Sequence, residues 1–287
     1  MFKKTMKKVA CGALALASSV ACLSTFTACE TSHPEVKMVL SFAKNANEVE
    51  YYELEYKLYR KITPSTVDHF LFLVEKGYYN GLCVHDYDEV NLKMYTGAYT
   101  WDKDTQELQE KNYFSVMENY EDFPHSVWMD DKKTLPLYTL RGEFEQNDVY
   151  VEKGDFLRES FGTLTMYYYQ KNTEDRIYMT GGDDITRRDY NYNGATSMFY
   201  ISMISSSSVT NSYCTFATLE KGKDRLEALQ DAIADYVEDL GEEESFVEER
   251  TVSVDKYDPI VGGQNRKETF EVPKAAITIE SITVKKY

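Results

Sequence analysis

The chain has 287 residues, of which 43% are hydrophobic, and it carries a formal net charge of −16 at pH 7. A chain of this length can bury a substantial core, so we expect one large domain with appendages. The first 28 residues hold four lysines and no acidic residue, which leaves a net charge of −20 on the rest. Such an acidic surface repels phosphate backbones, so the composition argues against nucleic acid as a partner.

The N-terminus predicts where the protein is located. A basic stretch, MFKKTMKK, precedes an apolar stretch rich in small residues, and the sequence FTAC ends at Cys29. This order is typical of a secretory signal and resembles a bacterial lipoprotein signal, with Cys22 as a weaker candidate for the processed cysteine. The apolar run is short and interrupted by Ser and Thr, which favours processing over a spanning anchor. We therefore expect a signal peptide over residues 1–28, a tether over 29–35, and a lipid on Cys29 that holds the protein to the extracytoplasmic face of a bacterial membrane.

Two strands and a helix open the domain. Apolar side chains alternate over residues 36–42, and more strictly over residues 52–58, which predicts two half-buried antiparallel strands. A helix follows, because Thr63 can cap its start, Pro64 suits its first turn and Gly77 suits its end. Its apolar residues recur at helical spacing, so the helix should pack on the sheet.

The rest of the chain predicts many strands and one more helix. Short apolar stretches and tyrosine-rich loops lead to a second helix that begins near Asp224. An acidic run over residues 238–250 follows, and we expect it to be a solvated excursion within an acidic insertion spanning about 238–270. Residues 276–284 predict a final strand with a bulge or kink. Many antiparallel strands with only two helices favour a mainly β fold, a closed barrel capped by helices.

Neither a disulfide framework nor a metal site is predicted. Cys83 and Cys214 lie far apart and lack metal-ligand spacing, so we expect both to be buried apolar residues. Residues 189–194 begin like a calcium-binding loop, but Tyr200 stands at the twelfth position, where such a loop needs Glu, so a turn is expected. No metal and no cofactor are expected. Three histidines are scattered along the chain and also lack the spacing of metal ligands: His69, His85 and His125.

Several blocks, in order, resemble the cyclophilins, a family of peptidyl-prolyl cis-trans isomerases. Residues 63–81, TPSTVDHFLFLVEKGYYNG, are similar to the family's TPKTVENFLxLVKKGYYDG, and VHDY at 84–87 stands where the family has FHRV. The stretches LRGEF, FGTLTM, NGATSMFYISM and YCTFATLEKGKDRLEAL match further family patterns. The resemblance covers most of residues 50–229 and the final strand. It implies a cyclophilin-like domain over 36–287, an eight-stranded antiparallel barrel with two helices and a proline-binding groove.

The resemblance places Asp86 where the family has its catalytic arginine. An X–Pro bond isomerises slowly because its amide must twist out of plane, over a barrier of about 18–20 kcal/mol. The family's arginine donates a hydrogen bond to the prolyl nitrogen, whereas a carboxylate offers no donor at neutral pH. Losing one preorganised donor typically costs about 10²–10³ in rate, so we expect weak or lost catalysis. Four arginines could enter the groove from loops as substitutes: Arg141, Arg158, Arg187 and Arg188.

The other groove positions implied by the resemblance have also changed. Counted without gaps, they fall on His85, Asn91, Leu92, Met94, Tyr167, Met198, Tyr200 and Tyr213. Leu92 and Tyr200 are suitable as the floor of a proline pocket. Met94 and Met198 replace polar side chains, and Tyr167 stands where the family has a small residue that lets the substrate backbone lie close.

Three functions stay open. The first is a lipid-anchored isomerase that assists the folding of secreted proteins, and the second is a non-catalytic module that binds extended or proline-containing segments. The third is glycan binding by the inserted loops at residues 95–119 and 167–193, which are rich in tyrosine. In each case we expect a monomer that meets the membrane through its N-terminal lipid.

Overall fold

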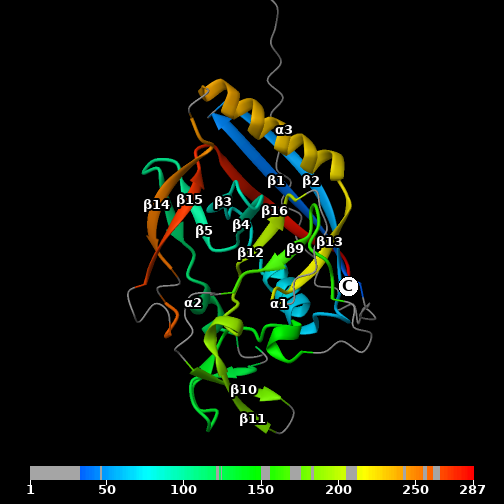
Figure 1. Ribbon diagram of the computed structural model, residues 1–287, viewed down its shortest axis with the longest axis vertical. Helices are drawn as coiled ribbons and strands as arrows, with labels where there is room; N and C mark the ends of the chain where they lie inside the picture. Colours follow the sequence, from blue (N-terminus) through cyan, green and yellow to red (C-terminus); the bar gives the residue numbers. More distant parts are fainter. Residues whose placement is uncertain are drawn as a thin grey trace, which may run out of the picture.

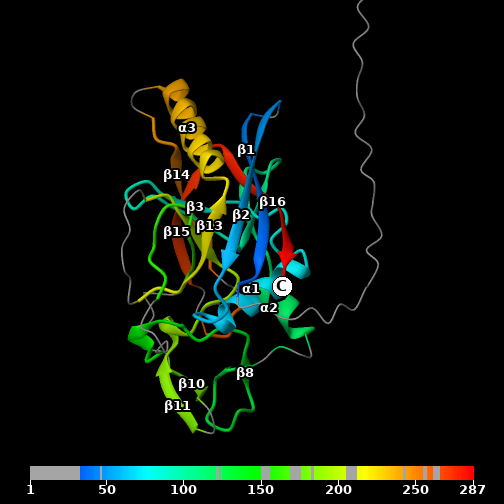
Figure 2. The ribbon, with the colours of Figure 1, turned by 90° about the vertical axis from the view of Figure 1, so that its right-hand side faces the viewer.

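The computed structural model describes residues 33–287, except 46, 121–122, 124, 150–155, 169–175, 182–183, 205–211, 242–243, 255–256 and 261–265. The predicted signal peptide and Cys29 lie outside the described residues. Within the described ranges, no helix is both long and apolar enough to cross a membrane. Figures 1 and 2 show a curled sheet with helices at its ends and a smaller β lobe below it.

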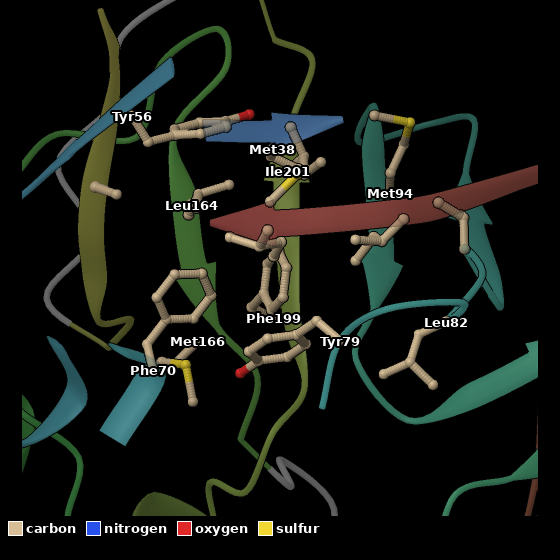
Figure 3. Close-up of a cluster of buried hydrophobic side chains, with 14 of the residues drawn as sticks. Met38, Tyr56, Phe70, Tyr79, Leu82, Met94, Leu164, Met166, Phe199 and Ile201 are labelled. Carbon is tan, nitrogen blue, oxygen red and sulfur yellow. The ribbon is translucent and has the colours of Figure 1, made fainter. Parts of the chain in front are cut away.

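A curled eight-stranded antiparallel sheet forms the body of the protein, in agreement with the predicted mainly β fold. Its strands lie side by side in the order β16 (Ala276–Lys286), β1 (Glu35–Asn45), β2 (Glu48–Leu58), β13 (Thr215–Lys221), β9 (Leu164–Met166), β12 (Phe199–Ser202), β4 (Lys93–Thr96) and β3 (Asp86–Asp88). The inner face of the sheet packs the hydrophobic core shown in Figure 3, which draws Met38, Phe199 and Ile201 among its members.

The alternation read from the sequence explains β1 and its neighbours. The apolar side chains of β1 that were predicted to share one face are all fully buried: Val36, Met38, Leu40 and Phe42. The predicted final strand becomes β16, which pairs with β1 along most of its length. Leu40 pairs with Ile279 but Val39 pairs with Ser281, so β16 carries one extra residue at this point. The predicted bulge is therefore confirmed, and it separates the two apolar pairs of β16.

Residues 81–84, just before β3, are hydrogen-bonded to β16, the strand at the opposite end of the sheet. The backbone N–H groups of Gly81 and Val84 donate to the carbonyls of Ile279 and Ile277, at 2.7 and 2.8 Å, and Ile279 donates in turn to Leu82 at 2.7 Å. These bonds occupy backbone groups of β16 that face away from β1. Closure of the sheet into a complete barrel stays a prediction.

The two predicted helices are present as α1 (Pro64–Glu75) and α3 (Lys223–Leu240). Thr63 precedes α1 but its side chain makes no capping bond. Instead, the Glu143 carboxylate accepts the backbone N–H groups of Ser65 and Thr66, at 3.0 and 2.9 Å. Thr63 therefore occupies the N-cap position as predicted, but it does not supply the capping bond. A carboxylate from a distant segment satisfies the free N–H groups instead and also suits the positive end of the helix. Gly77 ends α1 with φ +63, as expected.

The tyrosine-rich middle of the chain forms small elements beside the main sheet. The lobe below it in Figures 1 and 2 contains β7 (Val127–Trp128), β8 (Pro136–Leu137), β10 (Arg176–Gly181) and β11 (Asp184–Asp189). The remaining elements are β5 (Tyr99–Asp102), β6 (Glu107–Glu110), the short helix α2 (Tyr113–Glu118), and two 3-10 turns, Glu145–Asn147 and Tyr190–Tyr192. The second turn lies within residues 189–194, where a turn was predicted.

The described residues of the acidic insertion belong largely to regular elements packed on the body of the protein. Its start completes α3, and two later segments form a hairpin of β14 (Val247–Ser253) and β15 (Lys267–Pro273). Phe246 at the start of the hairpin is fully buried, against the rings of Phe42 and Tyr87. The prediction of an excursion is therefore wrong, although most of the described acidic side chains of the run are exposed as predicted. Buried apolar residues hold the segment against the sheet: Phe246, and Phe270 and Val272, which alternate with acids in β15.

Candidate functional site

The outer face of β3 and β4 carries the centre of the candidate site. Asp86 pairs with Tyr95 across these strands, and Asp88 pairs with Lys93. Since successive side chains of a strand point to opposite faces, these four share the outer face, while Tyr87 points into the core.

A pocket of about 360 Å³ lies on this face. Its lining comes from seven segments and consists of Asp86, Asp88, Asn91, Lys93, Tyr95, Met166, Tyr167, Tyr168, Tyr200, Tyr213, Glu268, Thr269 and Phe270. Five of the predicted site residues are thus brought together here: Asp86, Asn91, Tyr167, Tyr200 and Tyr213. Aromatic rings and carboxylates dominate the lining, which gives the pocket a polar rim and flat walls.

The other predicted site residues lie elsewhere. Met94 is fully buried in the core, near Met38 and Ile201 (Figure 3). Counting without gaps placed Met94 on the wrong face of its strand, and Tyr95 is the residue that lies beside Asp86. Leu92 is 37% exposed and sits in the turn before β4 with φ 53, so it is not part of the pocket floor.

His85 and Met198 are buried beside the pocket, in a second hydrophobic region under the β14–β15 hairpin. The His85 ring lies 4.9 Å from the ring of Tyr99 and 5.0 Å from that of Phe270. Met198 belongs to the same cluster as Tyr99, Phe270 and Val272. These predicted groove residues are therefore covered by the chain itself.

The β14–β15 hairpin reaches the central carboxylate. The backbone N–H of Glu271 donates to Oδ1 of Asp86 at 2.8 Å, and the Tyr99 hydroxyl donates to the carbonyl of Ser253 at 2.8 Å. Figure 1 shows β15 next to β3. Sequence reasoning missed this contact, although Phe270 and Val272 alternate with acids as a strand would. The alternation indicates that this segment forms a strand, but it does not show which surface of the protein the strand covers.

The family follows from a comparison with known proteins. Residues 45–252, more than half of the chain, match the family described as cyclophilin type peptidyl-prolyl cis-trans isomerase/CLD. This chain belongs to the cyclophilin family. The sequence stretches that resemble cyclophilins, around α1, β9, β12 and β13, lie within the matched residues.

Two solved structures are similar to this cyclophilin. One is a cyclophilin type peptidyl-prolyl cis-trans isomerase of Cryptosporidium parvum, at 15% sequence identity and a TM-score of 0.44, covering 89% of this chain and 99% of the other. The other is that protein in the presence of the dipeptide Ala-Pro, at 15% identity and a TM-score of 0.43, covering 88% of this chain and 99% of that one. No curated protein sequence matches the chain significantly.

The environment of Asp86 in this cyclophilin disfavours its charge. The pKa of Asp86 is raised from 3.8 to about 6, mainly by burial and also by the carboxylates of Glu271, Asp88 and Glu268, while the hydrogen bond from the Glu271 N–H opposes the rise. Burial lowers the pKa of His85 to about 3, which keeps that ring neutral. At neutral pH the centre of the site therefore presents an anion that accepts hydrogen bonds.

Lys93 supplies a cation to the pocket, and its charge is already engaged. Its Nζ lies 3.5 Å from Oε1 of Glu159 and 4.4 Å from the centre of the Tyr200 ring. The Tyr200 hydroxyl donates to Oε2 of Glu159 at 3.2 Å. The four arginines considered as substitutes are not among the described residues that line the pocket, and Arg188 pairs with Asp148 at 2.7 Å.

Cysteines and histidines form no site of their own in the part of the chain that is described. Cys83 and Cys214 are both buried, as predicted, and both are free thiols. Among the described residues, no group of three or more His, Cys, Asp or Glu could hold a metal ion. His69 and His125 line a separate, more apolar pocket of about 490 Å³ beside α1.

Proposed function

We propose that this cyclophilin is an extracytoplasmic, lipid-anchored protein that binds extended or proline-containing segments of secreted proteins. Turnover of the X–Pro bond is weak or lost. The order of basic stretch, apolar stretch and Cys29 supports the anchor. Membership of the family supports a groove for such segments, and the tyrosine-lined pocket offers flat apolar surface on which a prolyl ring can lie.

One observation carries the proposal of weak catalysis. As an X–Pro amide twists, resonance is lost and the prolyl nitrogen gains a lone pair, so a catalyst must aim a donor at it. Asp86, which the family resemblance puts at the donor position, accepts the Glu271 N–H and is surrounded by other carboxylates. An ionised carboxylate repels the electron density that the family's arginine would stabilise.

An active isomerase is the second candidate, and Lys93 favours it. Its ammonium group lines the pocket and lies over the ring of Tyr200, so it could provide a donor near a bound proline. The pairing of Lys93 with the buried Glu159 opposes this role, because leaving the pair would strand a buried carboxylate.

Exchange NMR on a short X–Pro peptide separates the two candidates. We expect the wild type to bind the peptide, seen as shifted resonances, and to interconvert its isomers far more slowly than an ordinary cyclophilin does. Asp86→Arg should recover little turnover, because Tyr167 still crowds the substrate backbone and a misplacement of about 1 Å can cost 10²-fold.

The contrary results have distinct meanings. Fast wild-type turnover that disappears in Lys93→Met, but persists in the surface control Lys61→Met, would establish an isomerase that uses Lys93. Absence of both binding and turnover would remove the proline groove altogether. A glycan screen would then test the inserted loops, the third possibility raised by the sequence.

A further inference from the structure

The pocket carries an excess of negative charge from two neighbouring strands. Asp86 and Asp88 come from β3, and Glu268 comes from β15 in the inserted hairpin. Asp88 also accepts the backbone N–H groups of Val90 and Asn91, which holds its carboxylate in place. The lysine of the lining is neutralised by Glu159, so three carboxylates face the pocket without a paired cation among the described lining residues.

Tyrosine rings form another wall of the same pocket. The ring of Tyr95 lies 5.8 Å from that of Tyr167 and 5.1 Å from that of Tyr200, and Tyr200 lies 6.4 Å from Tyr213. The face of an aromatic ring attracts a cation, most strongly where water is excluded. The wall already holds one ammonium group, since Nζ of Lys93 lies 4.4 Å from the Tyr200 centroid and 5.1 Å from the Tyr213 centroid.

We propose that this pocket selects segments that carry a lysine or arginine side chain beside the bound proline or extended stretch. The proposal rests on the proposed function, because it names the class of segment that the groove takes. A cationic side chain meets Asp88 and Glu268 at the rim and the rings of Tyr95 and Tyr167 on the wall. An acidic segment is repelled by the same carboxylates.

The contacts of Lys93 do not account for all of the aromatic rings and carboxylates that line the pocket. Its ammonium contacts explain Tyr200 and Tyr213, and its charge is balanced by Glu159. Tyr95 and Tyr167 extend the wall beyond that contact, and Glu268 reaches the pocket only because the inserted hairpin folds over the sheet. The insertion therefore supplies one of the three carboxylates of the pocket, together with Thr269 and Phe270 of its lining.

The test compares matched peptides on the full chain. A short Arg-Pro peptide and its citrulline-Pro analogue share their shape and differ in charge, and a Glu-Pro peptide reverses the sign. We expect the arginine peptide to bind about tenfold more tightly than the citrulline peptide at low salt, which is about 1.4 kcal/mol. High salt should remove most of the difference. The glutamate peptide should bind most weakly.

Two variants assign the effect to the pocket. Glu268→Gln should lower the affinity for the arginine peptide several-fold and leave that for the citrulline peptide unchanged. Asp231→Asn, on the exposed face of α3, removes the same charge away from the pocket and should change neither affinity.

Three results would overturn the inference. Equal affinities for the arginine and citrulline peptides would refute charge selection while leaving the proline groove intact. An equal loss for both peptides in Glu268→Gln would mean that this side chain acts only through the hairpin's structure. If none of the peptides binds, the proposed function itself fails, and the selection fails with it.

Discussion

Replacing Asp86 by Asn should stabilise the protein at neutral pH and leave its stability almost unchanged at pH 4. Asp86 is half-buried among acids, and the pKa of its carboxyl is raised from 3.8 to about 6. Asn keeps an oxygen that can accept the Glu271 N–H, which Asp86 accepts at 2.8 Å. The variant thus removes the charge and preserves the hydrogen bond.

The magnitude and sign follow from the pKa. Between about pH 4 and pH 6 the folded protein holds a proton on Asp86 that the unfolded chain releases, so the wild type loses stability as the pH rises through this window. Each tenfold change in an acid's dissociation constant is worth about 1.4 kcal/mol. A pKa raised from 3.8 to about 6 therefore costs the wild type at most about 3 kcal/mol above pH 6. We expect a gain of about 1–3 kcal/mol in the variant, since residual solvation reduces the full value.

Urea unfolding of both proteins between pH 4 and pH 7.5 measures this difference, with Asp231→Asn as the control for an exposed carboxylate. The free energies of unfolding of wild type and Asp86→Asn should diverge as the pH rises and run parallel above pH 6. A difference that is independent of pH, or a variant less stable than the wild type at pH 7.5, would refute the account of Asp86 as a buried, destabilising charge.

Three further predictions concern the sheet and the anchor. Truncation after Pro273 removes β16 and exposes the edge of β1, so it should abolish most of the stability; an unchanged melting temperature would contradict the role of β16. Gly97→Ala should destabilise by about 1–3 kcal/mol in urea, because a Cβ would lie 2.4 Å from the carbonyl oxygen of Ser197 and φ is +100; a neutral effect would show that the strands can shift. Cys29→Ser should release the protein from membranes or stall its processing, as fractionation and mass spectrometry would show; a normally cleaved, membrane-bound variant would argue against lipidation.

The local parts of the fold could be predicted from the sequence. Alternation over residues 36–42 and 276–284 located β1 and β16, because a half-buried strand must repeat its apolar side chains every second residue. Pro64 and Gly77 marked the ends of α1, because the geometry of a helix end restricts single residues. Ordered family blocks placed Asp86 at the position of the family's arginine, and the structure has Asp86 in β3, where it lines the pocket.

Long-range contacts decided the rest. Whether Met94 or Tyr95 lies on the outer face of β4 depends on how many residues the preceding turn contains. A shift of the strand register by one residue moves every side chain to the other face of the sheet. The cap of α1 comes from Glu143, which is remote in sequence. The acidic insertion is mostly polar, so its composition predicted solvent exposure, yet a few alternating apolar residues such as Phe270 suffice to dock it on the sheet. Sequence alone thus determined β1, β2, β16, α1 and α3, the elements with the clearest periodicity. Tertiary packing decided that the inserted hairpin reaches Asp86, because only the folded chain brings the Glu271 N–H to that carboxylate.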